Sequence, residues 1–300
     1  MLAFLNIEWQ TLADAVALGA IYALMAVGIG LVFGVLRLVN FAYGQLIMAG
    51  AFAMALSAGW GWPSWAGILL CFAVVLVLSL AMDRLVFRPL RGHSPAVMLV
   101  ATFAVAFLLE NVALLWFGSL GRIAFSLAKL NQPWTIGGVD IRKITVVAVA
   151  VAAVCLVALV LLLERTTIGL QMRAASLDIR TARMLGVRAD RVIGVAVLLS
   201  GLLAAVVAVL MTVQTPLVTP DFALQDTIVV LAGVVVGGMN RLVPATLGGF
   251  AIGFANGLLG GALPTTQSQY LPTFLFAAVI LVLLVRPNGI FTRFRSVERV

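Results

Sequence analysis

Long apolar runs separated by short polar breaks are the main pattern along this chain. Most runs are free of charge and approach the twenty or so residues that a helix needs to cross about 30 Å of hydrocarbon. The predicted spans cover residues 15–36, two helices within 38–82 on either side of a Gly-Trp-Pro break at 59–65, then 95–117, 144–163, 192–213, 227–240, 242–263 and 271–285. This pattern predicts an all-α integral membrane protein, a polytopic bundle of nine transmembrane helices, or of eight if the break at 36–45 only dips into the membrane.

Composition excludes an ordinary soluble domain. Hydrophobic residues make up 63% of the chain, and the mean hydropathy is +1.18. Cys71 and Cys155 lie inside apolar runs, so they offer neither a disulfide framework nor metal-ligand spacing. The net charge of +8 falls in the breaks between runs, and it therefore indicates membrane orientation and not a nucleic-acid partner.

The distribution of basic residues predicts which way the chain crosses the membrane. If residues 164–191 are cytoplasmic, alternation of the spans places 15 of the 19 lysines and arginines on the cytoplasmic side. The remaining four are Arg122, Lys129, Arg142 and Lys143. The positive-inside rule then predicts an N-terminus outside and a C-terminus in the cytoplasm.

Residues 164–191 form the one sizeable polar segment, with arginines at 165, 173, 180, 183, 188 and 191. Its helix-forming residues predict a short helix from about 170 to 185, with Gly186 at the C′ position and Asp190 as a cap for the next span. The small Ala174-Ala175 pair beside Arg173 would leave a low patch for a partner to contact. The alternative is a membrane loop whose arginines serve only to keep it inside.

The string GLQMRAAS at 169–176, followed by Ala182, Leu185-Gly186-Val187 and an apolar helix, resembles the coupling loop of ABC-importer permeases, and most closely the branched-chain amino acid (leucine/isoleucine/valine-type) permease family. The likeness runs over nearly the whole chain, which implies a single transmembrane permease domain at 1–300. In that family the loop, here 164–191, forms a cytoplasmic coupling helix that docks on an ATPase. The matching ATPase-coupling residues are Gly169, Arg173, Ala174, Ala175, Ala182 and Gly186.

Two polar breaks are candidates for the translocation path. The first holds Asn40, Tyr43, Gly44 and Gln45, and the second holds Asn240-Arg241 with Pro244. Backbone that leaves a helix at membrane depth must be buried in protein or line water, and transporters build paths from such segments. The first break resembles the family's Asn-Phe-Ala-His-Gly-Glu string, with Tyr43 and Gln45 in the His and Glu positions, so a proton-handling role for that pair is not expected here.

Glu110 and Asn111 form a polar pair inside the span at 95–117. A carboxylate within a span is costly and usually faces the bundle interior with a partner, which makes the pair a second candidate for the path. Equally, Glu110 could be protonated, or partly hydrated near the outer end of its helix. Asp226 has a simpler interpretation, because the helix dipole favours a carboxylate in a first turn.

Small residues four apart occur in two of the predicted spans. Ala26, Gly30 and Gly34 share one face of the first span, and the later set is Gly249, Gly253, Gly257 and Gly261. Such faces let helix backbones approach closely, so we expect tight packing inside the bundle.

The chain lacks the residues that an enzyme of its own would need. It has one histidine, His93, and no GxxxxGK[ST] string, so neither a catalytic triad, a metal site nor ATP hydrolysis by a P-loop is expected, and no cofactor is implied.

The resemblance implies a permease of an ABC importer in the bacterial inner membrane, moving branched-chain amino acids or small solutes such as urea or amides. Its implied partners are a second homologous permease subunit, two cytoplasmic ABC ATPase subunits, a periplasmic solute-binding protein and the lipid bilayer. The alternative from another class is an ion- or proton-coupled secondary transporter, for which Glu110 is the one serious titratable candidate.

Overall fold

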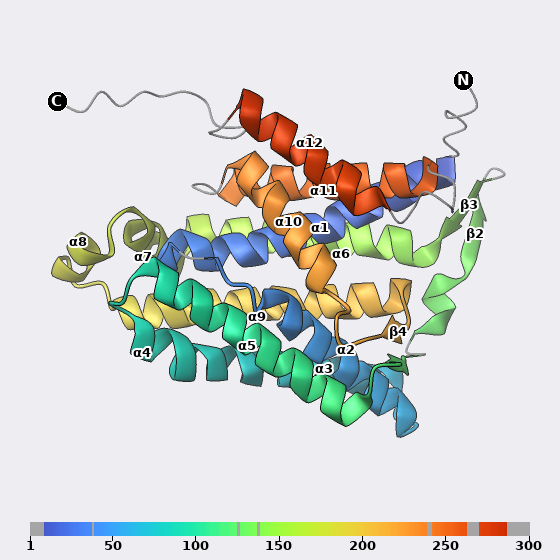
Figure 1. The fold of residues 1–300 in the computed structure, drawn as a ribbon, viewed down its shortest axis with the longest axis horizontal. Coiled ribbons are helices and arrows are strands. Elements are labelled where there is room, and N and C mark those ends of the chain that lie inside the picture. Colours follow the sequence, from blue (N-terminus) through green and yellow to red (C-terminus); the bar gives the residue numbers. More distant parts are fainter. Residues whose placement is uncertain are drawn as a thin grey trace.

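The structure is a computed structural model that describes residues 9–37, 39–124, 127–136, 139–238, 242–262 and 270–286. Six helices in these ranges are long and apolar enough to cross a membrane. They are α1 (Trp9–Leu36), α3 (Ser64–Met82) with its continuation, α5 (Pro95–Phe117), α6 (Lys143–Arg165), α9 (Ala189–Gln214) and α11 (Leu242–Ala262). Three shorter apolar helices join them in the bundle, α2 (Tyr43–Gly59), α10 (Leu224–Gly237) and α12 (Leu271–Val285) (Figure 1). The predicted all-helical membrane fold is confirmed.

The predicted breaks also occur where the sequence indicates them. α1 ends at Leu36 and α2 begins at Tyr43, and the Gly-Trp-Pro break separates α2 from α3. The segment after α3 differs from the loop expected there. The helix continues through a π-helical stretch, η2 (Asp83–Phe87), and a last turn, α4 (Arg88–Leu90), before the chain turns at Gly92, whose φ is +112°.

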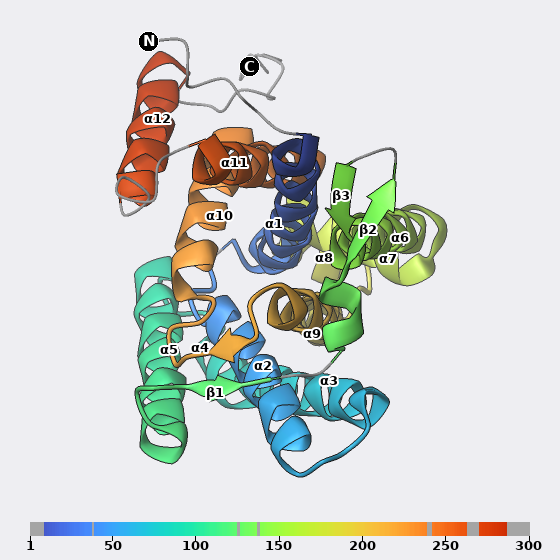
Figure 2. The ribbon, with the colours of Figure 1, turned by 90° about the vertical axis from the view of Figure 1, so that its right-hand side faces the viewer.

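α1 and α9 occupy the centre of the bundle, and the other long helices surround them (Figure 2). In the most apolar stretch of α1, 83% of residues are buried within the chain, whereas the figure for α5 is 22%. Apolar side chains are therefore left on the outside of α5, where lipid or another membrane subunit can cover them.

α1 and α11 run antiparallel along a seam of small residues. Four glycines of α11 face α1 at successive turns, at Gly249, Gly253, Gly257 and Gly261. A Cβ atom built at Gly253 would lie 2.7 Å from the Cβ of Tyr22, and one at Gly257 would lie 2.5 Å from the Cα of Ala15. No side chain fits at such distances, so the predicted tight packing is confirmed for this set of glycines. Of the earlier set, Ala26 and Gly30 also meet α11, but Gly34 lines a cavity and a Cβ atom there would have no neighbour within 4 Å, so the prediction is wrong at Gly34.

The two ends of the bundle carry different structures (Figure 1). At one end, the sheet end, β1 (Arg122–Ile123) pairs with β4 (Leu217–Val218), and β2 (Pro133–Ile136) pairs with β3 (Val139–Arg142), both antiparallel. A short 3₁₀ helix, η3 (Ala128–Asn131), precedes β2. The opposite end carries α7 (Thr167–Leu177) and α8 (Ile179–Met184), together with α4.

The central arginine-rich segment forms two helices where the sequence predicts one. The hydroxyl of Thr166 accepts a hydrogen bond of 3.0 Å from the amide of Gly169 and caps α7, and α7 ends before Asp178. Gly186 has a φ of +86°, as its predicted C′ position requires. The expected cap at Asp190 is wrong, because α9 begins one residue earlier, and the Asp190 carboxylate instead pairs with Arg91.

Candidate translocation path and coupling surface

Two short helices, α2 and α10, start inside the bundle with their N-terminal ends together. Gly44, in the first turn of α2, lies so close to Thr227 and to the carbonyl oxygen of Ala223 that a side chain at position 44 would clash with both. The hydroxyl of Tyr43 lies against Gly28, which is roughly 12 Å before the end of α1 at 1.5 Å per residue. The first amides of a helix lack intrahelical partners, so these ends place partial positive charge inside the bundle.

The predicted path residues of the first break lie together at this point. The side-chain oxygen of Asn40 accepts a hydrogen bond of 3.1 Å from the amide of Ala42, which fixes the approach to α2. Gln45 Nε2 donates to Glu110 Oε2 over 3.4 Å. The hydroxyl of Tyr43 and Oε1 of Gln45 are buried and have no hydrogen-bond partner among the described residues. Unpaired buried polar atoms are costly, which makes them candidates for contact with a transported molecule or with water.

Glu110 and Asn111 do not act as a pair. Glu110 turns toward α2 and Gln45, whereas Asn111 is exposed and its amide donates to the carbonyl oxygen of Phe107 in its own helix, at 2.8 Å. Glu110 is half-buried. It therefore has both an interior partner and partial exposure, the two features that the sequence analysis gave as alternatives.

A second polar group in the interior joins three helices, and sequence reasoning did not find it. The hydroxyl of Tyr22 in α1 donates to the carboxylate of Asp226 in the first turn of α10. The amide of Asn256 in α11 donates to the same hydroxyl at 2.8 Å. The position of Asp226 agrees with the helix-dipole interpretation, but its hydrogen bond comes from a residue 204 positions away. No local motif carries that signal.

The second predicted break lies largely outside the described residues, which is the case for Asn240 and Arg241. Pro244 lies in the first turn of α11 and lines a cavity of about 580 Å³ at the α7–α8 end. Residues of α1, α6 and α7, among them Gly30, Leu163 and Arg173, form the other walls.

The six predicted coupling residues divide into two groups. Three are buried against the chain's own helices, at Gly169, Ala175 and Ala182. Three are half-buried or exposed, at Arg173, Ala174 and Gly186. A Cβ atom at Gly169 would clash with the carbonyl oxygens of the last turn of α6, so this glycine permits the sharp turn between α6 and α7.

Four large apolar side chains of α7, α8 and the turn after α8 are exposed, and sequence reasoning missed them. Their exposed fractions are 61% for Leu170, 84% for Leu177, 88% for Met184 and 79% for Leu185. These four residues form the α7–α8 apolar surface. An apolar group at the end of a bundle and beside many arginines is typical of a surface that another protein covers. The signal in the sequence was the presence of large aliphatic residues within a segment otherwise rich in arginine.

One ion-pair cluster connects the end of α3 with the start of α9. Arg91 donates to Asp190 at 2.6 Å and also pairs with Asp83, and the side chains of Arg91 and Asp83 are only 11% and 8% exposed. Among the described residues no group of three or more His, Cys, Asp or Glu side chains could hold a metal ion.

Two solved structures share this architecture. PsaBC from Streptococcus pneumoniae, solved with a Fab, superposes with a TM-score of 0.52 at 12% identity, and the match covers 94% of each chain. An inward-facing structure of a metal-chelate-type ABC transporter superposes with a TM-score of 0.53 at 20% identity, over 94% of this chain and 89% of the other. At these identities the likeness concerns the fold alone.

Sequence relatives extend over the whole chain. The permease BraD of the high-affinity branched-chain amino acid transport system of Pseudomonas aeruginosa is 29% identical, and the permease LivH of Escherichia coli K12 is 28% identical. In each case the match covers 97% of both chains. The family model described as the permease component of the branched-chain amino acid transport system matches residues 11–285. This chain therefore belongs to the branched-chain amino acid transport permease family.

Proposed function

We propose that the chain is a membrane permease subunit of an ABC importer that carries branched-chain amino acids into the cell, and that residues 1–300 act as one permease domain. The family and the similarity to BraD and LivH support the substrate class. The observation that carries the coupling role is the α7–α8 apolar surface, which stands exposed at one end of the bundle. The chain has no P-loop, so ATP hydrolysis must come from a partner with a surface that covers these residues.

The proposed partners are a second homologous permease, two ATPase subunits and a periplasmic solute-binding protein. In this arrangement the protein lies in the bacterial inner membrane with the α7–α8 end in the cytoplasm and the N-terminus outside, as the distribution of basic residues predicts. The ATPase would contact the α7–α8 apolar surface, together with Arg173, Ala174 and Gly186. Gly169, Ala175 and Ala182 would instead hold α7 and α8 against the bundle, because they are buried in it.

The connections of α7 and α8 explain how docking could move the path. Only Thr166 separates α7 from α6, and a short turn at Gly186 joins α8 to α9. A push on this pair therefore acts on α6 and on the central helix α9 together. α9 is linked to α1 by the hydroxyl of Ser200, which donates to the carbonyl oxygen of Gly28 at 2.8 Å, beside Tyr43. Movement of α9 would thus reach the start of α2.

The N-terminal end of α2 suits a substrate that carries a carboxylate, whereas the first turn of α10 already holds the carboxylate of Asp226. Helix N-terminal ends attract negative charge, and discontinuous helices of transporters present such ends to anionic groups of substrates. Asn40, Tyr43, Gly44, Gln45 and Glu110 would line this part of the path. Asn111 faces away from it, so its place in the path is not supported by the geometry.

The proposal is tested by uptake of labelled leucine into proteoliposomes that contain the chain with its ATPase, permease and solute-binding partners. Met184→Asp with Leu185→Asp should abolish leucine uptake and weaken ATPase binding at least a hundredfold, because a charged residue in an apolar contact must be desolvated. Leu120, 90% exposed in a turn at the sheet end, supplies the control, and Leu120→Asp should leave uptake unchanged.

Uptake of labelled urea and benzoate in the same vesicles tests the substrate class. Leucine uptake with little urea or benzoate uptake is the expected result. Normal leucine uptake by the double variant would contradict the coupling role, and faster urea uptake than leucine uptake would contradict the substrate.

A further inference from the structure

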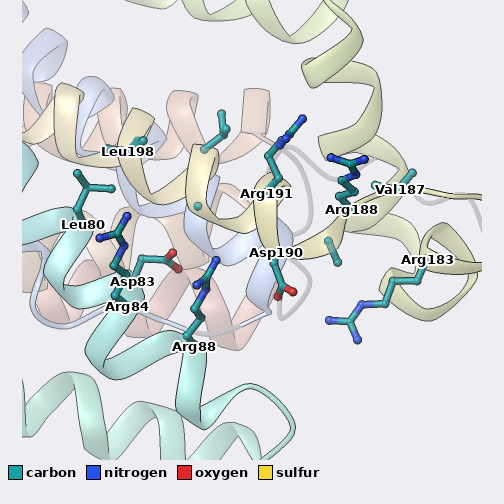
Figure 3. A pocket seen from close by; sticks show the side chains of 13 residues that line it. Leu80, Asp83, Arg84, Arg88, Arg183, Val187, Arg188, Asp190, Arg191 and Leu198 are labelled. Carbon is teal, nitrogen blue, oxygen red and sulfur yellow. The ribbon is translucent and has the colours of Figure 1, made fainter.

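A groove of about 800 Å³ opens between the end of α3 and the start of α9, on the side of the α7–α8 end (Figure 3). Deeper in the bundle the two helices touch, because the hydroxyl of Ser79 donates to the carbonyl oxygen of Val197 at 2.8 Å and Gly201 lies against Ser79. From Ser79 toward the α7–α8 end, the groove is lined by residues 80–88 on one side and 187–198 on the other, and the carboxylate of Asp83 lies near Gly194 of α9.

Five arginines line this arginine groove, and none of their side chains has an ion-pair or hydrogen-bond partner among the described residues: Arg84, Arg88, Arg183, Arg188 and Arg191. Arg84 and Arg88 come from the helix that continues α3, and Arg183 comes from α8 across the groove (Figure 3). The two acidic side chains of the groove, Asp83 and Asp190, are both held by Arg91. The groove therefore offers a surplus of unpaired positive charge.

The inner part of the groove is apolar. Leu80, Val195 and Leu198 form its wall, and Leu80 and Leu198 lie at the opposite side of the view from Arg183 and Arg188 (Figure 3). From Ala189 to Leu198 the groove follows α9 for roughly 14 Å at 1.5 Å per residue. One end of the groove therefore suits an anion, and the other end reaches into the apolar part of a membrane-spanning helix.

We propose that the arginine groove binds one anionic phospholipid, with its phosphate group beside Arg84 and Arg88 and the start of its acyl chains along Leu80 and Leu198. Charge complementarity and the apolar inner wall together favour this occupant. An ATPase subunit could neutralise the arginines, but it would stay outside the hydrocarbon and leave the inner wall uncovered. Basic pockets between transmembrane helices at the cytoplasmic face are known to suit anionic headgroups.

Native mass spectrometry of the purified chain in neutral detergent, with phosphatidylglycerol or phosphatidylcholine added, tests this proposal. The wild-type chain should retain one phosphatidylglycerol in preference to phosphatidylcholine. Arg84→Gln with Arg88→Gln should weaken that binding about thirtyfold, because each arginine near the headgroup contributes about a factor of five. The matched control, Arg165→Gln with Arg286→Gln, removes two exposed arginines outside the groove and should change binding less than twofold. Arg84→Lys with Arg88→Lys keeps the charge and should retain most of the binding.

Three results would overturn the proposal. They are equal retention of the two lipids by the wild-type chain, an equal loss of phosphatidylglycerol in both glutamine variants, and displacement of the lipid by millimolar inorganic phosphate. Loss of ATPase binding with unchanged lipid binding in Arg84→Gln with Arg88→Gln would assign the groove to a subunit interface and would also overturn it. The assignment to the cytoplasmic leaflet rests on the proposed function, but the lipid measurement needs neither uptake nor ATPase, so the two can fail separately.

Discussion

The α1–α11 seam and the arginine groove join helices by opposite means. At the seam the glycines of α11 have no side chains beyond hydrogen and meet α1 directly, whereas at the groove long arginine side chains line the space between the end of α3 and the start of α9. The seam leaves no space for any other molecule. The groove leaves positive charge without a partner from the described chain, and the neighbouring α7–α8 apolar surface leaves aliphatic side chains uncovered. This difference indicates that the seam serves stability and that the α7–α8 end serves contacts with other molecules.

Substitution within the seam should have the largest effect on stability. Gly253→Ala with Gly257→Ala should lower the free energy of unfolding by about 4 kcal/mol, because each added methyl group meets α1 at a distance that only a shift of the helices can relieve. Reversible denaturation of the purified chain in detergent measures the change. Gly34→Ala is the control, since a Cβ atom there has no neighbour within 4 Å and alanine favours a helix, so stability should hold or rise by up to about 1 kcal/mol. Equal losses in both variants would contradict the packing of the seam.

Substitutions in the ion-pair cluster beside the groove should have the next largest effect on stability. Arg91→Gln should lower the free energy of unfolding by about 2 kcal/mol, because it leaves the buried carboxylate of Asp83 without its partner. Asp190→Asn should cost less than about 1 kcal/mol, because the Asp190 side chain is 62% exposed. The same denaturation measurement applies, and a cost for Asp190→Asn as large as that for Arg91→Gln would show that both pairs are equally important.

Two buried tyrosines allow a comparison between a hydroxyl that has hydrogen-bond partners and a hydroxyl that has none among the described residues. Tyr22→Phe removes a hydroxyl that both donates to Asp226 and accepts from Asn256, and it should cost about 1 to 3 kcal/mol. Tyr43→Phe removes a hydroxyl without a partner among the described residues and should change stability by less than about 0.5 kcal/mol. If the Tyr43 hydroxyl lines the path, the rate of leucine uptake should change while the denaturation midpoint stays constant. A large loss of stability in Tyr43→Phe would mean that this hydroxyl has a structural partner.

The smallest effect is expected for the arginines of the groove. Arg84→Gln with Arg191→Gln should leave the free energy of unfolding within about 0.5 kcal/mol of the original in neutral detergent, because neither side chain has an ion-pair or hydrogen-bond partner among the described residues. A clear loss of stability would show that these arginines contribute to folding and would remove the contrast with the seam.

Local patterns in the sequence predicted the features that depend on neighbours along the chain. The spans, the break before Tyr43, the glycine face of α11 and the positive φ of Gly186 all follow from residue type and spacing. They are set by hydrophobic length, by helical periodicity and by the freedom of glycine.

The features that the sequence could not predict depend on which helices become neighbours. Gly44 meets Thr227, and Tyr22 meets Asp226 and Asn256, only after distant helices have packed together. The same applies to Asp190, whose carboxylate pairs with Arg91 of the preceding half of the chain instead of capping its own helix. In each case the neighbouring sequence is compatible with several roles for the residue, and a tertiary contact decides which role it has.

The most direct test of the account is photo-crosslinking from single sites at the two ends of the molecule. A photoreactive amino acid at position 184, on the α7–α8 apolar surface, should crosslink to the ATPase subunit in the assembled transporter, and one at position 120, at the sheet end, should not. Gel mobility and mass spectrometry of the crosslinked product identify the partner. A crosslink to the ATPase from position 120, or none from position 184 in an intact complex, would contradict the claim that α7 and α8 carry the coupling surface.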